Sequence, residues 1–319
     1  MSIKIKLFEA FAGYGGASFA LKKAGIKNKT IGFSENDKFA IQIYELNHPK
    51  VKNYGDITAI NHEVLPDFNF FTGGFPCQPF SQAGDGLGVN DTRGTLFNDI
   101  IRICKYKQPD NILLENVKGL MTSRHKNTLR TIYEELSRIG YNVHVQLLNS
   151  KNYGIPQNRE RVWIYASKKN FPIDFDLAPN PIPLKKDLKY FLDKCPEEHL
   201  YLNEKQINRL IELHKVDLDV KEPCCFDIYN KKVRTDGVCV TITEPHHNTM
   251  RIVEPKKDNK FVVRKLSTFE HFRLMGFRDG QINFEDLSYT QICKRAGNGW
   301  DINIASIIMK NIIKFYYDL

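Results

Sequence analysis

The sequence lacks the cysteine and histidine spacings that hold a metal or cross-link a secreted protein. Its seven cysteines include no C-x-x-C pair, and its nine histidines include no H-x-x-x-H pair. An odd number of cysteines without paired spacing argues against a disulfide framework and against a zinc ribbon. We therefore expect a protein without structural disulfides and without a bound metal.

Long apolar stretches are also lacking. No basic start followed by an apolar segment opens the chain, and no uninterrupted apolar run approaches the length of a membrane span. These absences predict a soluble protein of the cytoplasm.

Positive charge, by contrast, is abundant. The chain has 46 Lys and Arg against 37 Asp and Glu, which gives a net charge of +9. This balance favours a polyanionic partner, nucleic acid first, although many soluble proteins carry similar charge for solubility alone. With 319 residues, the chain is long enough for one large domain and a smaller one.

Strands and helices alternate through the first part of the chain. The apolar runs at residues 68–71 and 111–114 are typical of buried strands, and the stretches at residues 38–46 and 96–106 are typical of helices. This alternation predicts an α/β domain with a largely parallel sheet.

The pattern changes near residue 171. Five of the fourteen prolines fall between residues 171 and 200, and the alternation is lost. A long amphipathic helix at residues 302–317 is suited to packing on the first domain. We expect residues 171–263 to form a smaller, irregular domain, and residues 1–170 and 264–319 to form the large one.

A single cysteine, Cys77, lies in a turn after the apolar run at residues 68–71. Pro76 precedes it, and Pro79 follows two residues later. Because proline fixes φ and removes a backbone donor, the two prolines restrict how the thiol is presented. A buried structural cysteine is the alternative, and for an isolated cysteine it is the commoner case.

Residues 11–16 form a glycine-rich turn between an expected strand and an expected helix. Glycines let a ligand approach the backbone, and the start of a helix is electropositive. Glu35 ends the next strand, where a carboxylate can hold a ribose diol. The G-x-G-G spacing fits an adenosyl ligand at least as well as a dinucleotide, and a turn without ligand is the alternative. Asp56 could receive an adenine amino group or be an ordinary loop aspartate.

Further charged groups lie at the ends of later strands. Glu115 ends an apolar strand, where open α/β sheets keep their chemistry, or it is a helix-cap partner. Gln157, Arg159 and Arg161 fall on one face of an extended segment. Neighbouring guanidiniums bind a carboxylate, a phosphate or a base edge, and a solvated strand edge is the common alternative.

Together these groups have one chemical interpretation, which is methyl transfer to carbon 5 of a cytosine. Carbon 5 is a poor nucleophile until the Cys77 thiolate adds to carbon 6 and makes the ring enamine-like. Glu115 would hold N3 and the exocyclic amine, and Arg161, with Arg159 beside it, would hold O2. The target base must leave the duplex for a cysteine at a strand end to reach it.

Eight short blocks carry a family resemblance. They lie at residues 11–16, 35–37, 55–57, 74–81, 93–97, 115–117, 157–161 and 297–299. The most specific are Gly-Phe-Pro-Cys-Gln-Pro-Phe-Ser at residues 74–81 and Gln-Asn-Arg-Glu-Arg at residues 157–161. In these blocks and in their order, the chain resembles the DNA (cytosine-5) methyltransferases of bacterial restriction–modification systems.

The resemblance implies a Rossmann-like methyltransferase fold with S-adenosylmethionine as methyl donor and Cys77 as covalent nucleophile. It also implies that residues 82–94 close over a flipped base and that the small domain recognises a target sequence in double-stranded DNA. The residues that would line the donor pocket are Phe11, Ala12, Gly13, Tyr14, Gly15, Gly16, Glu35, Asn36, Asp56, Ile57, Pro76, Leu96 and Asn298. Those that would contact DNA are Gln78, Ser81, Gln82, Arg93 and Thr241.

By the same resemblance the protein would be a bacterial or phage-encoded monomer, linked genetically to a restriction endonuclease without binding it. Three segments depart from the family pattern, and one of them, residues 277–279, lacks the usual proline, which concerns structure rather than chemistry. Glu9 stands where aspartate is more usual, and residues 299–301 replace a small-polar and aliphatic run, which leaves the far wall of the donor pocket open.

Two alternatives remain at this point. An RNA cytosine methyltransferase would share the same blocks, and a catalytically silent DNA-binding relative would keep the fold. Intact Cys77, Glu115, Arg159 and Arg161 argue against the silent relative. A nicotinamide dehydrogenase would need a fuller glycine pattern than residues 11–16 provide.

Overall fold

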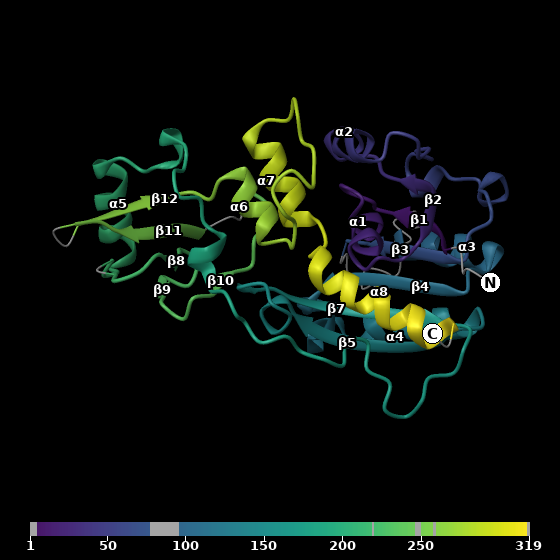
Figure 1. Cartoon of the computed structure of the whole chain (residues 1–319). Coiled ribbons are helices and arrows are strands. Elements are labelled where there is room, and N and C mark those ends of the chain that lie inside the picture. Colours follow the sequence, from purple (N-terminus) through teal and green to yellow (C-terminus); the bar gives the residue numbers. More distant parts are fainter. Residues whose placement is uncertain (1–4, 77–95, 219, 246–249, 258–259, 318–319) are drawn as a thin grey trace, which may run out of the picture. The chain divides into compact units, whose positions relative to one another are not determined.

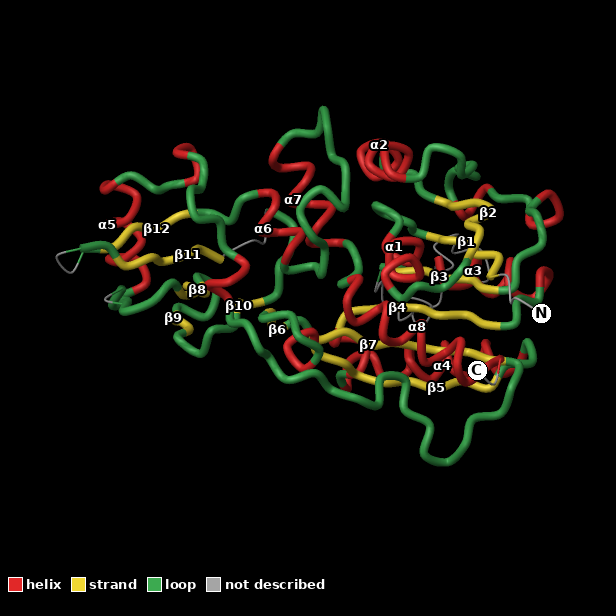
Figure 2. The backbone as a smooth tube through the Cα atoms, viewed as in Figure 1, coloured by secondary structure: helices red, strands yellow, loops and turns green. Residues whose placement is uncertain are grey.

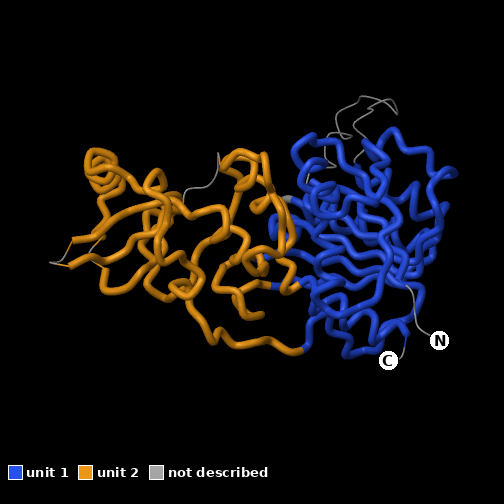
Figure 3. Tube along the Cα trace, turned by 45° about the horizontal axis from the view of Figure 1, so that its top comes forward, with its two compact units in different colours: residues 1–148, 160–179, 305–319 blue, residues 149–159, 180–304 orange. Residues whose placement is uncertain are grey.

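The computed structural model describes residues 5–76, 96–218, 220–245, 250–257 and 260–317 (Figure 1). The chain divides into two compact units (Figure 3). Unit 1 comprises Met1–Leu148, Glu160–Pro179 and Ala305–Leu319, and unit 2 comprises Asn149–Arg159 and Asn180–Ile304. Among the described residues, no helix is long and apolar enough to cross a membrane.

Unit 1 is built on a six-stranded sheet of order β2-β1-β3-β4-β7-β5, drawn in yellow in Figure 2. The strands are β1 (Ile5–Ala10), β2 (Asn28–Ser34), β3 (Phe70–Gly74), β4 (Asn111–Val117), β5 (Asn142–Asn149) and β7 (Glu160–Ser167). Strand β1 is parallel to β2 and β3, and β3 is parallel to β4, whereas β7 is antiparallel to β4. The predicted α/β class with a largely parallel sheet is confirmed.

Helices cover both faces of this sheet. They are α1 (Gly16–Lys23), α2 (Lys38–Asn47), α3 (Leu96–Lys107), α4 (Lys126–Arg138) and α8 (Ile302–Tyr317). Helices α3 and α4 share one apolar cluster with the side of β7 that carries Ile164. Phe315 of α8 contacts Tyr165, which points to the opposite face because side chains alternate along a strand. The sheet is therefore buried on both sides, as a parallel sheet requires.

The strand order creates a switch point at β1. The chain leaves β1 for β2 on one side and later returns to β3 on the other. In open α/β sheets, ligands bind outside the carboxyl ends of the strands where the order reverses. A ligand site is therefore expected at the turn after β1 and at the ends of β2, β3 and β4.

Unit 2 contains two small sheets. Strands β8 (Cys224–Asp227), β9 (Lys232–Arg234), β11 (Met250–Pro255) and β12 (Phe261–Arg264) form an antiparallel sheet of order β12-β11-β8-β9. Strands β6 (Gln157–Asn158) and β10 (Cys239–Val240) form a parallel pair. The helices are α5 (Glu204–His214), α6 (Thr268–Arg273) and α7 (Tyr289–Asn298). This part of the chain is more regular than the sequence pattern predicts.

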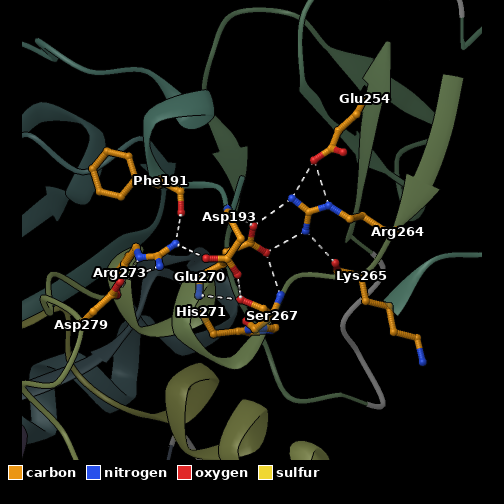
Figure 4. Close-up of polar contacts among 10 residues, drawn as sticks. All are labelled: Phe191, Asp193, Glu254, Arg264, Lys265, Ser267, Glu270, His271, Arg273 and Asp279. Atoms are coloured by element: carbon orange, nitrogen blue, oxygen red, sulfur yellow. Dashed lines mark hydrogen bonds and ion pairs between the residues drawn. The ribbon is translucent and has the colours of Figure 1, made fainter. Parts of the chain in front are cut away.

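The division by contacts differs from the expected domain boundaries. Residues 149–159 and 264–304 group with residues 180–263 rather than with unit 1. A buried charge network explains the second difference (Figure 4). The Arg264 guanidinium donates to both carboxylate oxygens of Glu270 at 2.8 Å and to Glu254 at 2.8 Å. Arg273 pairs with Asp193 at 2.7 Å. Helix α6 is therefore fixed both to β12, through Arg264, and to the segment that contains Asp193.

Candidate active site

The turn after β1 has a backbone that favours glycine. Phe11, Gly13 and Gly15 have φ of 51°, 56° and 87°, all in the left-handed region. A Cβ on Gly15 would lie 2.4 Å from Nε2 of His48, so a side chain at this position would also clash. Ala12, Tyr14 and Gly16 are buried, so all six residues pack into the turn or shape it.

Glu9 holds the start of α1. Its buried carboxylate accepts hydrogen bonds from the backbone N–H groups of Ala17 and Ser18 at 3.0 and 3.1 Å and from the hydroxyl groups of Ser18 and Tyr44 at 2.6 and 2.7 Å. Burial raises the pKa of this carboxyl, and the hydrogen bonds oppose that effect. Glutamate is therefore accommodated at position 9, where aspartate is more usual, because these four donors satisfy its carboxylate.

Glu35 ties the turn to the end of β2. Its Oε2 accepts the N–H of Gly13 at 3.0 Å, and its Oε1 accepts the N–H groups of Asn36 and Asp37 at 3.0 Å. Asn36 in turn donates to Asp56 at 2.9 Å. Hydrogen bonds from Thr58, followed by the one from Asn36, lower the pKa of Asp56. The structure brings these predicted donor-pocket residues together at one edge of the sheet.

The apolar members of the predicted pocket share one hydrophobic cluster. Ile57 belongs to the cluster under α3 and α4, and Phe11 and Leu96 pack against that cluster while half-buried. Asn298 belongs to unit 2, where its amide donates to Glu244 at 2.6 Å.

The cysteine turn begins at the end of β3. Cys77, Gln78, Ser81, Gln82 and Arg93 lie outside the described residues. Phe75 is buried and Pro76 is exposed, and Gly74 is the register partner of Glu115 on β4.

Asn116 is a functional candidate that the sequence reasoning missed. Its buried amide donates to the carbonyl of Phe75 at 3.0 Å, and its Oδ1 accepts the N–H of Val117 at 2.8 Å. Asn116 therefore fixes the chain two residues before Cys77. Its place in the block at residues 115–117 was the available signal, but the direction of its amide cannot be read from a sequence.

Glu115 and Arg161 form an ion pair at the carboxyl end of β4. Nε of Arg161 lies 2.9 Å from Oε1 of Glu115, and the side chains are 15% and 11% exposed. An ion pair this little exposed is held in one arrangement, yet it keeps a small surface that a ligand can reach. The structure thus joins two of the predicted catalytic residues.

Arg159 is engaged differently. Its buried guanidinium donates to the carbonyl groups of Ile242, Gly297 and Gly299 at 3.0, 3.2 and 2.7 Å, all within unit 2. The alternative that this arginine lies on a solvated strand edge is wrong, because Arg159 is only 2% exposed. These contacts give Arg159 a structural role, and its place beside Arg161 at a base stays a prediction.

Gln157 and Thr241 belong to the same arrangement in unit 2. The side chain of Gln157 accepts the N–H of Ile242 at 2.9 Å and donates to the carbonyl of Leu274 at 2.7 Å. Thr241 donates to the carbonyl of Asn158 at 2.7 Å. The backbone at residues 241–242 is therefore fixed by the block at residues 157–159.

The block at residues 297–299 packs against this segment. A Cβ on Gly297 would lie 2.6 Å from the carbonyl oxygen of Thr243, so only glycine allows this close approach. In the departing run after it, Trp300 is buried and Asp301 accepts the N–H of Asn303 at 2.8 Å near the start of α8. The departure thus has a local structural role.

Known proteins are similar to this chain over nearly its whole length. The profile of the family of C-5 cytosine-specific DNA methylases matches residues 5–314. The type II methyltransferase M.NgoBI of Neisseria gonorrhoeae is 36% identical over 311 residues, covering 96% of this chain and 92% of that protein. The type II methyltransferase M.HhaI of Haemophilus parahaemolyticus is 31% identical, covering 97% of this chain and 94% of that protein.

Solved structures share the fold. A mutant of Spodoptera frugiperda DNMT2 matches with a TM-score of 0.77 at 20% identity, covering 97% of this chain and 99% of that chain. The S. pombe Dnmt2 methyltransferase matches with a TM-score of 0.69 at 21% identity, covering 98% of this chain and 99% of that chain. At these identities the likeness shows the fold alone.

The chain therefore belongs to the family of C-5 cytosine-specific DNA methylases, and its reaction is that of a DNA (cytosine-5)-methyltransferase. Members of this family take the methyl group from S-adenosylmethionine. The resemblance read from the sequence blocks is confirmed, and the family description names DNA rather than RNA.

Proposed function

We propose that this enzyme methylates one cytosine within a specific sequence of double-stranded DNA, as the methyltransferase of a restriction–modification system. The support for that role is the type II designation of the relatives, such as M.NgoBI and M.HhaI. The enzyme would act as a cytoplasmic monomer in a bacterium or a phage-infected cell, without binding the cognate endonuclease.

The carboxyl edge of β1 and β2 fits the adenosyl part of S-adenosylmethionine. Glu35 lies at the end of β2 and can accept hydrogen bonds from a ribose diol, since a carboxylate has more acceptor sites than its three backbone donors fill. Asp56 and Asn36 offer an acceptor and a donor for the adenine edge. Phe11, Ile57 and Leu96 supply apolar surface nearby. When bound, this molecule supplies an electrophilic methyl group.

The Glu115–Arg161 pair would handle the target base. The guanidinium donates to O2 of the cytosine, and the carboxylate accepts from the exocyclic amine and shares a proton with N3. The interactions at O2 and N3 strengthen as negative charge moves into the ring. The pair therefore stabilises the transition state more than the bound base.

Cys77 would be the nucleophile. Its thiolate forms a bond to carbon 6, and the electrons of the carbon 5–carbon 6 double bond move toward carbon 5 and N3. After carbon 5 is methylated, a base removes its proton, the double bond re-forms and the thiolate leaves. Asn116 would hold the preceding backbone through the Phe75 carbonyl.

Unit 2 would read the DNA. Its residues 241–242 are fixed by Gln157 and Arg159, which suits a segment that must present Thr241 in one position. Gln78, Ser81, Gln82 and Arg93 would contact the DNA around the flipped cytosine, and Asn298 would complete the donor pocket. Residues 1–170 with 264–319 would carry out catalysis, and residues 171–263 would supply target recognition.

The observation that carries this proposal is the Glu115–Arg161 pair at the strand end next to β3. The test is expression in a host without DNA methylation, followed by bisulfite mapping of the plasmid. We expect modified cytosines in one recurring sequence. Purified enzyme with labelled donor should modify duplex DNA and not transfer RNA, and the reverse preference would overturn the proposal.

A further inference from the structure

A pocket of about 420 Å³ lies within unit 2, between α5 and the β12 side of the antiparallel sheet. Its walls come from residues 199–202, from α5, and from Arg251 and Lys265. The N–H of Leu202 donates to the carbonyl of Val263 at 2.8 Å, and the N–H of Lys265 donates to the carbonyl of Leu200 at 3.0 Å. One wall is thus hydrogen-bonded to β12 like an added strand and is held rigidly.

The charged side chains that line this pocket are cationic, and Tyr201 and Gln206 add neutral polar groups. Arg209, Arg251 and Lys265 line it, together with His199 and His214, and no aspartate or glutamate is among its lining residues. Burial lowers the pKa of Arg251, because the guanidinium has lost part of its hydration. This guanidinium donates to the carbonyl of Met250 at 2.7 Å and stays charged, so it adds positive charge to the wall of the pocket.

The remaining lining is apolar. Leu210 and Leu213 of α5 and Leu200 and Leu202 of the opposite wall line the same space. Cations beside aliphatic side chains suit a ligand that carries an anionic group on a compact, weakly polar body. A deoxyribose with its phosphate has this composition, because the phosphate binds the cations and the sugar carbons contact the leucines.

Another pocket, of about 700 Å³ in unit 1, shows the difference. There Arg102 donates to Asp99 and to the carbonyl groups of Ile57 and Ile60, and Arg138 pairs with Glu135. The arginines of that pocket are engaged with carboxylates that belong to the same surface. It carries no comparable preference for an anion.

We propose that the pocket formed by Arg209, Arg251 and Lys265 binds a backbone phosphate of the substrate DNA, with its deoxyribose against the leucines. This proposal rests on the proposed function, since it assumes duplex DNA as substrate. Such a contact fixes the position of unit 2 on the duplex without reading sequence.

The test uses the full-length enzyme and a duplex that contains its target sequence. The variants are Arg209→Gln and Lys265→Gln, whose side chains are exposed, so we expect both variants to keep the fold. Arg251→Lys keeps the charge of this half-buried position. Lys205→Gln is the matched control, because Lys205 is exposed on the same helix but does not line the pocket. The dissociation constant for DNA is measured from about 50 to 300 mM salt.

We expect Arg209→Gln and Lys265→Gln each to reduce the slope of log affinity against log salt by about 0.9, and to weaken binding about eightfold at 0.1 M salt. Arg251→Lys should keep the wild-type slope, and Lys205→Gln should keep both the wild-type slope and the wild-type kcat. Pocket variants that bind like Lys205→Gln, while wild type methylates DNA, would overturn the pocket proposal alone. Wild type that neither binds nor methylates duplex DNA would overturn both proposals.

A second arm distinguishes DNA from a free nucleotide as the source of the phosphate. Deoxyadenosine monophosphate is titrated into the wild type and followed by calorimetry. Heat that is lost in Arg209→Gln, together with an unchanged DNA slope, would show a free-nucleotide site and contradict the assignment to DNA. No heat from the nucleotide, together with the reduced slope, supports it.

Discussion

Arg161 lies 2.9 Å from Glu115, across two antiparallel strands of one sheet. The pairing register explains the contact. Arg161 is opposite Val117, and Glu115 precedes Val117 by two residues, so both charged side chains point to the same face as diagonal neighbours. The geometry of the pair is thus set by backbone hydrogen bonds and does not depend on a ligand.

Replacing the carboxylate should separate catalysis from binding. Glu115→Gln keeps the shape of the residue but removes the charge that shares the proton with N3. We expect kcat to fall by roughly 10²- to 10⁴-fold, the range typical of a lost acid–base group, while the dissociation constant for DNA stays near wild type. Single-turnover methylation and a binding titration measure the two. Glu160→Gln, at a neighbouring strand residue paired with Lys118, is the control and should retain activity. An active Glu115→Gln enzyme would contradict the role.

The Arg159 contacts predict that replacing this residue lowers stability and weakens the binding of both DNA and donor. A lysine keeps the charge but cannot reach the three carbonyl groups of Ile242, Gly297 and Gly299 with one nitrogen. Each lost hydrogen bond from a charged donor contributes about 1.5–3 kcal/mol, so Arg159→Lys should lower the unfolding temperature by several degrees. KM for DNA and for the donor should rise together, because residues 241–242 and 297–299 are both released. A variant with wild-type stability and only kcat reduced would instead support direct contact with the base.

Alanine variants of Gly15 and Gly25 test whether the turn after β1 binds the methyl donor. In Gly15→Ala the new Cβ would meet the His48 ring at 2.4 Å in a backbone with φ of 87°. Gly25→Ala is the matched control, since Gly25 has φ of 73° but no atom within 4 Å of the new Cβ. Both variants bear backbone strain of about 1 kcal/mol, whereas the clash affects only the first. We expect donor affinity, measured by calorimetry, to fall at least tenfold in Gly15→Ala and to persist in Gly25→Ala. Equal affinities would show that the turn is remote from the donor.

His48 makes stability depend on pH. Burial, with a smaller contribution from Lys22, lowers the pKa of His48 to about 4 in the folded protein. The unfolded chain binds a proton near pH 6.5, so the folded state binds fewer protons between these values. The contribution of His48 to the free energy of unfolding is therefore fully present above pH 6.5. It is lost as the pH drops toward 4, by up to about 3 kcal/mol. Denaturant unfolding across this range should show a reduced pH dependence in His48→Gln. The exposed His199→Gln is the control, and equal slopes in all three proteins would contradict the assignment.

The sequence predicts unit 1 well because its strands carry unbroken apolar runs and its site residues follow them directly. Residues 11–16, Glu35 and Glu115 could be placed at strand ends from the alternation alone, and the structure places them there. The expected strand before Asp56 is wrong, because Asp56 instead caps a 3-10 turn at Ile57–Ala59.

Unit 2 was less predictable. Helix α5 begins with a capping box formed by Asn203 and Gln206, a signal that was present in the sequence but not used. The network around Arg264 joins residues from several segments, such as Asp193 and Glu270, which only the folded chain brings together. Arg159 likewise meets its partners only in the folded chain, because Ile242 and Gly297 lie 83 and 138 residues away along the sequence.

Covalent trapping tests the central claim most directly. A duplex with 5-fluorocytosine at the mapped target cytosine is incubated with enzyme and S-adenosylmethionine, and the product is digested and sequenced by mass spectrometry. Since fluorine cannot leave as a proton does, the adduct through carbon 6 should persist and should lie on Cys77. Cys77→Ala should form no adduct and should not methylate DNA, while still binding DNA and donor. Wild type that methylates ordinary DNA but forms no adduct, or an adduct on another of the seven cysteines, would contradict the account.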